Sequence, residues 1–296
     1  MPREFTSTAA PSPRAAARPA RPARSEPITS RDNRWLKLFR EALRDGYAAT
    51  QHRIGIEGPH LIEEAVRSGL EIDACLVSPA GEKHLSVLGP ASSRARILRS
   101  TERLFDGVAA TDHPQGIAAL VQPRDWSFDD LVRGDVPLVV VLAGVQDPGN
   151  VGTVMRSAEA FGATGCAATR GTADPWSSKA LRASAGSALR IPLLRGIAPT
   201  VLLAQLRVAG LAILATISKQ THDTGATPLV AATQLRSPCA IFIGNEGAGL
   251  SSEIVNSADA RISVPMAAGV ESLNAGVAAS VILYEAARQR AGQLPT

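Results

Sequence analysis

The sequence contains little cysteine and lacks a long hydrophobic run. Its three cysteines, Cys75, Cys166 and Cys239, cannot all pair and match no zinc-binding spacing, which argues against a disulfide scaffold or a structural metal. The five histidines have no ligand spacing either. The longest apolar stretch, Val136 to Val145, is far shorter than the about 20 residues that a membrane span needs. These absences predict a cytoplasmic protein that needs neither metal nor membrane.

The net charge is distributed unevenly along the chain, and the length suggests more than one domain. The 296 residues suggest two domains, and a hydrophobic content of 45% excludes disorder throughout. Residues 1–26 hold five arginines against two glutamates, so they carry +3 of the total net charge of +4. Because this segment is also rich in proline and alanine, we expect a disordered tail over 1–26. It is predicted to be a solvated basic arm, with an organelle transit peptide as the alternative.

A helix with one basic face opens the first folded region. Its cations recur at spacings of three and four, and apolar residues occupy the other side. An RNA-facing stripe and an ordinary surface helix explain this face equally well, because acidic residues dilute its charge. The candidate RNA-binding side chains are Arg34, Lys37, Arg40 and Arg44.

Short strands and helices alternate after this helix, which predicts a small α/β domain over 27–125. The polar, mixed stretch 126–135 is predicted to be a linker. The expected elements are strands at 53–57, 74–78 and 116–122 and a helix at 60–68.

Apolar runs alternate with helical patterns throughout 136–296. Since such runs are typical of strands covered on both faces, we predict a mostly parallel sheet with helices on both faces. Ligands of such sheets bind beyond the carboxyl ends of the strands. The expected strands are 136–143, 163–168, 211–217, 239–244 and 260–264, and the expected helices are 151–161, 177–184, 200–209 and 272–290.

Two loops after these strands contain candidate functional residues. In the first, Pro148 and Gly149 turn the chain, Asn150 is a candidate helix cap, and Arg156 follows in the second helical turn. The second loop, 244–250, has three glycines around Glu246. Its spacing is not that of a dinucleotide or phosphate-binding loop, which disfavours phosphate cofactors.

The third segment runs from Val264 into the last helix. Ser272 or Asn274 is predicted to cap that helix, whose first turns are rich in small residues. An apolar stripe on the helix, Leu273 to Tyr284, is predicted to be core or a subunit contact.

Taken together and in this order, the three segments resemble the SpoU/TrmH class of the SPOUT superfamily, which are S-adenosylmethionine (AdoMet)-dependent RNA 2′-O-ribose methyltransferases. The segment from Asn150 to Arg156, the loop 244–249 and the Val-Pro-Met…Ser-Leu-Asn segment match the three motifs of that class. The resemblance covers about residues 136–292. In the front half, Ile54-Gly-Ile-Glu-Gly-Pro-His-Leu and His113-Pro-Gln-Gly-Ile look like the ribosomal-protein-like substrate-binding domain that is often fused ahead of this unit.

The resemblance implies a C-terminal SPOUT domain with a deep trefoil knot, an exception to the rule that chains avoid knots. It also implies AdoMet as cofactor, a homodimer and structured RNA as the partner. The positions that match cofactor-binding residues are Gly244, Val264, Leu273, Met266 and Ile243, and those that match catalytic residues are Arg156, Asn150, Glu246, Ser272 and Asn274.

Arg156 matches the arginine that is proposed to activate the 2′-hydroxyl in this family. A guanidinium is a poor base at neutral pH, so we expect Arg156 to anchor a phosphate and to stabilise the developing alkoxide. We expect Asn150 and Asn274 to orient the ribose or the arginine, and Glu246 to fix Arg156 or the loop geometry.

Two other functions remain open on the sequence. One is a methyltransferase for transfer RNA, although the fused front domain favours structured ribosomal RNA, which proteins recognise by shape and exposed loops. The other is a noncatalytic RNA-binding protein that keeps the fold. Neither folded region is basic overall, so RNA affinity is expected to depend on locally sorted arginines.

Overall fold

The first sheet of the computed structural model has the strand order β1-β5-β4-β6-β3-β2 and mixes parallel with antiparallel pairs. The structure describes residues 25–48, 52–218 and 230–291. The predicted strands and helices of this region are confirmed within two residues of their ends. The elements are β1 Ser25–Pro27, α1 Arg34–Asp45, β2 Tyr47–Ala48, β3 Arg53–Glu57, α2 Pro59–Arg67, β4 Ile72–Val77, the 3-10 helix η1 Pro79–Ser93, β5 Arg96–Arg99, α3 Glu102–Asp106 and β6 Ile117–Val121.

Helix α1 forms because its sequence supplies a cap, one apolar face and a stop. The Asn33 side chain accepts the amide of Trp35, and Gly46 ends the helix with a φ of 78°. Leu36, Phe39 and Leu43 are fully or almost fully buried against one face of the sheet. The basic face is therefore left outside.

Regular secondary structure occurs in both the predicted tail and the predicted linker. Strand β1 begins at Ser25 and pairs with β5, and Glu26 forms an ion pair with Arg96 at 3.0 Å, so the tail prediction was two residues too long. The rest of that tail, 1–24, lies outside the described residues. In the predicted linker, α4 (Phe128–Leu131) has a capping box, and Leu131 is fully buried under the second sheet.

The second sheet is entirely parallel in its described pairs, with the order β12-β10-β11-β7-β8-β9. This confirms the predicted mostly parallel sheet of an α/β domain. Its elements are β7 Leu138–Ala143, α5 Pro148–Ala160, β8 Gly165–Thr169, α6 Ser178–Ala183, α7 Ser187–Arg190, β9 Leu193–Ile197, α8 Pro199–Val208, β10 Ala212–Thr216, the 3-10 turn η2 Val230–Ala232, β11 Cys239–Gly244, α9 Ser252–Asn256, β12 Ala260–Ile262 and α10 Ala275–Arg290.

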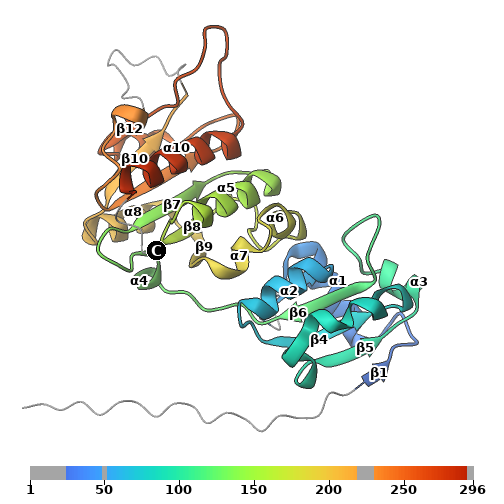
Figure 1. Cartoon of the computed structure of the whole chain (residues 1–296). Coiled ribbons are helices and arrows are strands. Elements are labelled where there is room, and N and C mark those ends of the chain that lie inside the picture. The colour runs from blue at the N-terminus through green and yellow to red at the C-terminus, as the bar shows by residue number, and fades with distance from the viewer. Residues whose placement is uncertain (1–24, 49–51, 219–229, 292–296) are drawn as a thin grey trace, which may run out of the picture.

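Alternate residues of the central strand β7 enter two different cores. Val140 and its neighbours on one face pack with α5, α6 and α10, whereas Val141 and its neighbours on the other face pack with α4, α8 and α9. Both sets are fully buried. The near-continuous apolar sequence of β7 is thus explained by helices on both sides (Figure 1).

The two domains interlock where α1 ends. A Cβ on Gly46 would lie 2.5 Å from the backbone of Trp176, so only glycine fits there. Next to it, the Arg195 guanidinium lies 4.4 Å from the ring centre of Tyr47 and 3.9 Å from that of Trp176. The first domain and the second are therefore joined by packing as well as by the chain (Figure 1). Within the described residues, no helix has the length and hydropathy of a membrane span.

Candidate active site

The first two loops predicted to be functional lie side by side, because β7 and β11 are neighbours in the sheet. The chain leaves β7 through Gly144, which has a φ of 79°. Asn245 Nδ2 donates to the Gly144 carbonyl oxygen at 3.0 Å, and the Asn245 Oδ1 accepts the amides of Gly247 and Ala248. One asparagine therefore shapes the second loop and fastens it to the first.

Glu246 makes a second set of contacts between these loops. Its carboxylate accepts the backbone amides of Gln146 at 3.1 Å and Asp147 at 3.2 Å, and Asn150 Nδ2 at 2.9 Å. Burial raises the pKa of Glu246, but these hydrogen bonds outweigh it and hold the pKa below its usual range. The carboxylate is bound to the first loop, so of the two predicted roles the geometry favours fixing the loop over fixing Arg156.

Asn274 extends this network to the third segment. Its Nδ2 donates to Asn150 Oδ1 at 2.8 Å, while its own Oδ1 accepts the first amides of α10, at 2.9 Å from Gly276 and 3.2 Å from Val277. Asn274 is thus the cap of α10, as predicted for Ser272 or Asn274. The network Glu246–Asn150–Asn274 joins three segments of the chain, since Asn150 lies 96 residues before Glu246 and 124 residues before Asn274.

The prediction that Asn150 caps α5 was wrong. The helix begins at Pro148, and Asp147 is the cap, with its Oδ1 accepting the Gly149 amide at 3.1 Å. Proline at the first helical position requires no amide partner, and the helix starts three residues earlier than the predicted residue 151. Asn150 is consequently inside the first turn, 8% exposed, and its side chain is available for both Glu246 and Asn274.

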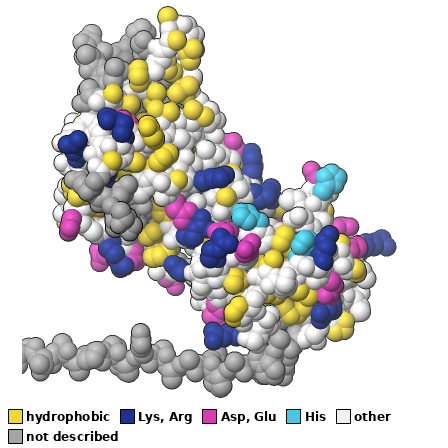
Figure 2. Space-filling view, viewed as in Figure 1, with side chains coloured by type: hydrophobic (Ala, Val, Ile, Leu, Met, Phe, Trp, Pro, Cys, Tyr) yellow, Lys and Arg dark blue, Asp and Glu magenta, His cyan; other side chains and the backbone are white. Residues whose placement is uncertain are grey.

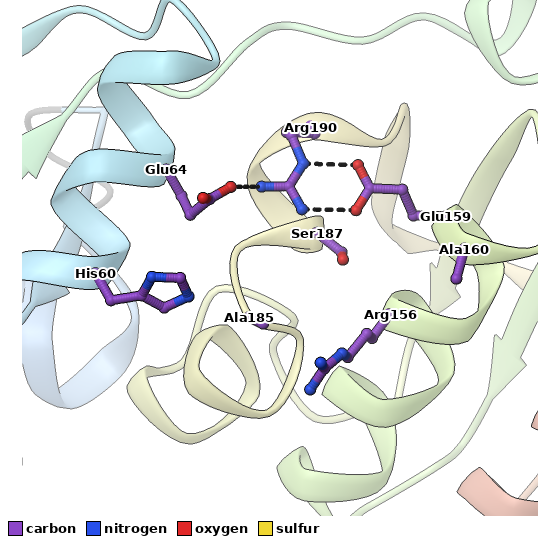
Figure 3. Close-up of a pocket in the computed structure, with 8 residues that line it drawn as sticks. All are labelled: His60, Glu64, Arg156, Glu159, Ala160, Ala185, Ser187 and Arg190. Atoms are coloured by element: carbon purple, nitrogen blue, oxygen red, sulfur yellow. Dashed lines mark hydrogen bonds and ion pairs between the residues drawn. The ribbon is translucent and has the colours of Figure 1, made fainter.

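Arg156 lies away from the network, in a pocket of about 370 Å³ between the two domains. The pocket is lined by α2 of the first domain and by α5 and the 185–190 segment of the second. In Figure 3 the Arg156 side chain points into this space, and the His60 ring faces it from α2. Arg156 is exposed, and within the described ranges it has no hydrogen bond or ion pair.

Sequence reasoning missed an ion-pair cluster in the same pocket. Arg190 donates two parallel hydrogen bonds of 2.7 Å to the Glu159 carboxylate and a third to Glu64 of the first domain (Figure 3). The hydrogen bonds from Arg190 hold the pKa of Glu159 low, and Glu159 in turn raises the pKa of Arg190. No sequence signal pairs Arg190 with Glu64, which lies 126 residues away along the chain.

The predicted cofactor-binding residues lie at the carboxyl edge of the sheet. Ile243 is buried in β11 and Gly244 ends that strand, whereas Val264 and Met266 are half-buried. Leu273 is 38% exposed on the segment that leads from β12 to α10 and that projects from the body in Figure 1. Ser272 is also exposed and has no hydrogen bond in the described part of the chain.

Three of the four predicted RNA-binding side chains are exposed to solvent. Arg34, Lys37 and Arg44 are exposed along α1. Arg40 is half-buried, and its Nε donates to the Gly107 carbonyl oxygen at 3.3 Å, so part of its role is to hold the loop after α3.

The predicted apolar stripe of α10 faces outward. Val277, Val281 and Tyr284 are 48%, 39% and 57% exposed. The Tyr284 ring meets the ring of Phe161, the residue that caps the end of α5, edge-on, with 5.9 Å between the ring centres. Figure 2 shows hydrophobic side chains gathered on the face that carries α10. In the described residues, no group of three or more His, Cys, Asp or Glu is placed to hold a metal ion.

Comparisons with known proteins match both halves of the chain. Residues 137–284 match the SpoU rRNA Methylase family, and residues 47–119 match the MRM3-like substrate binding domain. An uncharacterized tRNA/rRNA methyltransferase of Synechocystis sp. is 34% identical over 271 residues, or 89% of this chain and 94% of the relative. The 23S rRNA (guanosine(2553)-2′-O)-methyltransferase RlmP of Bacillus subtilis is 31% identical over 229 residues, or 77% of this chain and 86% of the relative.

Solved structures resemble the whole described molecule. The AdoMet-bound rRNA methyltransferase from Sinorhizobium meliloti has a TM-score of 0.76 at 27% identity, with 92% of this chain and 99% of that chain covered. The SpoU methyltransferase AviRb from Streptomyces viridochromogenes in complex with AdoMet has a TM-score of 0.75 at 27% identity, with 88% and 98% covered.

Proposed function

Because the chain belongs to the SpoU rRNA methylase family, we propose that it transfers a methyl group from AdoMet to a ribose 2′-hydroxyl of structured ribosomal RNA. The network Glu246–Asn150–Asn274 carries this proposal, because it joins one polar residue from each of the three motif segments at the carboxyl edge of the sheet.

The residues at this edge fit AdoMet. Gly244 has no side chain, Ile243 and Val264 are apolar, and the exposed Leu273 offers a further apolar surface to an adenine ring. The site would hold the cofactor mainly with backbone groups and these walls. When bound, AdoMet supplies an electrophilic methyl group on its sulfonium.

Arg156 acts on the RNA in this proposal. Its guanidinium binds the phosphate beside the target ribose and stabilises the negative charge that develops on the attacking oxygen. A guanidinium is a poor base at neutral pH, so the hydroxyl proton passes to solvent rather than to Arg156. Asn150 and Asn274 orient the ribose, while Glu246 keeps the first loop in place. Ser272 contributes a hydroxyl next to the cap of α10.

The finer features implied by the family belong to the same proposal. We assign the exposed stripe of α10 to the contact between two copies of the chain, since an apolar patch of this kind is typical of interfaces. We also assign to this chain the trefoil knot of the family and a cytoplasmic location. The assigned RNA contacts come from Arg34, Lys37, Arg40 and Arg44. The last helix, α10, packs on α5, and a 2.7 Å hydrogen bond joins Ser157 of α5 to Ser280 of α10.

Mapping 2′-O-methyl groups in total RNA from cells with and without the gene tests the proposal. We expect one ribosomal position to lose its methyl group without the gene. A lost transfer RNA position would move the substrate to transfer RNA, and an unchanged map would indicate a noncatalytic RNA-binding protein.

Arg156→Lys tests the mechanism on the purified enzyme. Lysine keeps the charge but loses the planar fork, so we expect kcat to fall by about 100-fold, with unchanged AdoMet affinity by calorimetry. Arg133→Lys is the matched control, because Arg133 is exposed, forms an ion pair with Asp130 of α4 and does not line the pocket of Arg156. Wild-type turnover in Arg156→Lys would contradict the assigned role.

A further inference from the structure

The pocket around Arg156 is built by both domains. His60 and Glu64 come from α2 of the first domain, and Arg156 and Glu159 come from α5 of the second. Figure 2 shows basic, acidic and histidine side chains together at this junction. The pocket has a volume of about 370 Å³, which is enough for a phosphate with part of its sugar.

Arg190 fixes the two walls of this pocket relative to each other. It binds Glu159 through two hydrogen bonds and Glu64 through a third. Glu64 lies one helical turn after His60, and Glu159 lies one turn after Arg156. The Arg190 clamp therefore holds His60 and Arg156 across the pocket from each other, as Figure 3 shows.

The carboxylates of the pocket are already neutralised. Both oxygens of Glu159 are taken by Arg190, and Glu64 also accepts from Arg67 at 2.6 Å. Arg156 and His60, by contrast, have no hydrogen bond or ion pair within the described part of the molecule. The donors left facing the pocket are thus a guanidinium and an imidazole, which together suit an anion.

The start of α2 adds to this preference. His60 is the second residue of α2, and no side chain caps the helix. Its first amides therefore keep their partial positive charge near His60. Two side chains and a helix end favour a negative ligand at the same junction.

We propose that this pocket binds one phosphodiester of the substrate RNA, with Arg156 and His60 donating to its oxygens from opposite walls. The inference rests on the proposed function and deepens it. His60 is then a positioning residue for methyl transfer, supplied by the substrate-binding domain to the catalytic domain of the same chain. The clamp Glu64–Arg190–Glu159 serves to keep the two donors on opposite walls of the pocket.

The test uses the full-length protein and ribosomal RNA purified from cells that lack the gene, with S-adenosylhomocysteine present for binding. We expect His60→Ala to weaken RNA binding by about tenfold, because one hydrogen bond to a phosphate oxygen is lost. In turnover assays the KM for RNA should rise while kcat and AdoMet affinity stay close to wild type. His60→Arg should restore binding, because an arginine in place of the imidazole also donates to phosphate.

His84→Ala is the matched control, since His84 lies in the same domain on η1 and does not line the pocket. Wild-type RNA affinity in His60→Ala would overturn the proposal. An equal loss in His60→Ala and His60→Arg would also overturn it, because only the shape of histidine would then matter. Failure of the proposed function is seen separately: the methylation map stays unchanged, whereas the RNA affinities of the His60 variants still decide whether His60 contacts phosphate.

Discussion

Replacing Asn274 separates its two roles, as the cap of α10 and as a donor to Asn150. Asn274→Ala removes a cap that serves two backbone amides, which costs about 1 kcal/mol, and one side-chain hydrogen bond, which costs about 1 kcal/mol more. We therefore expect the free energy of unfolding to fall by about 2 kcal/mol. In a thermal melt followed by circular dichroism, this corresponds to a decrease of about 6 °C.

Asn274→Asp is the informative partner of this variant. An aspartate still caps the helix, and its charge is favoured at that end, but it has no hydrogen to donate to Asn150 Oδ1. Asn150 cannot correct this by turning its amide, because Glu246 needs its Nδ2. We expect a loss of only about 1 kcal/mol in stability, yet a loss of methyl transfer at least as large as that of Asn274→Ala.

The two measurements together decide the argument. If Asn274→Asp were as active as the wild type, the hydrogen bond to Asn150 would be irrelevant to catalysis. If Asn274→Ala were as stable as the wild type, the cap would contribute nothing and the stability estimate would be refuted. Calorimetric titration with AdoMet shows whether either variant has lost the cofactor site.

Three further predictions follow from buried or exposed groups. Because the pKa of Glu246 is lowered in the folded protein, the carboxylate contributes fully to stability above the usual glutamate pKa, and this contribution is lost as the pH falls through the folded pKa. Glu246→Gln lacks this carboxylate and should therefore lose less stability than the wild type when the pH is lowered from about 7 to about 3, as measured by urea unfolding. Arg290, 5% exposed, donates to three backbone carbonyls, so Arg290→Met should cost about 4 kcal/mol, whereas the exposed Arg288→Met should cost less than about 1 kcal/mol; equal costs would contradict this. Val281→Asp on the exposed stripe should yield monomers in light scattering, and an unchanged mass would exclude this face as the subunit contact.

Periodic apolar runs predicted most of the sheet. Strands β3 and β11 have the bounds expected from the sequence, because both are short, mostly buried apolar runs bounded by a turn-forming residue, Gly58 after β3 and Pro238 before β11. Strand β9 was missed. It lies at the sheet edge and contains Arg195 and Gly196, so it lacks the apolar run that identifies a covered strand.

Contacts between distant segments could not be predicted from the sequence. The motifs identified Asn150, Glu246 and Asn274 one by one, but their hydrogen bonds depend on which strands are neighbours. The Arg190 clamp depends further on how two domains pack. A glutamate on a helix surface has the same sequence pattern whether it faces water or an arginine of another domain.

Gly46 has a consequence for how this protein can be recombined. Because a Cβ there would collide with the backbone of Trp176, the end of one domain's helix is shaped to the surface of the other. A chimera that takes its front domain from a relative must therefore bring a glycine at this place, together with a ring to stack under Arg195. Two domains that look interchangeable along the sequence are therefore a fitted pair.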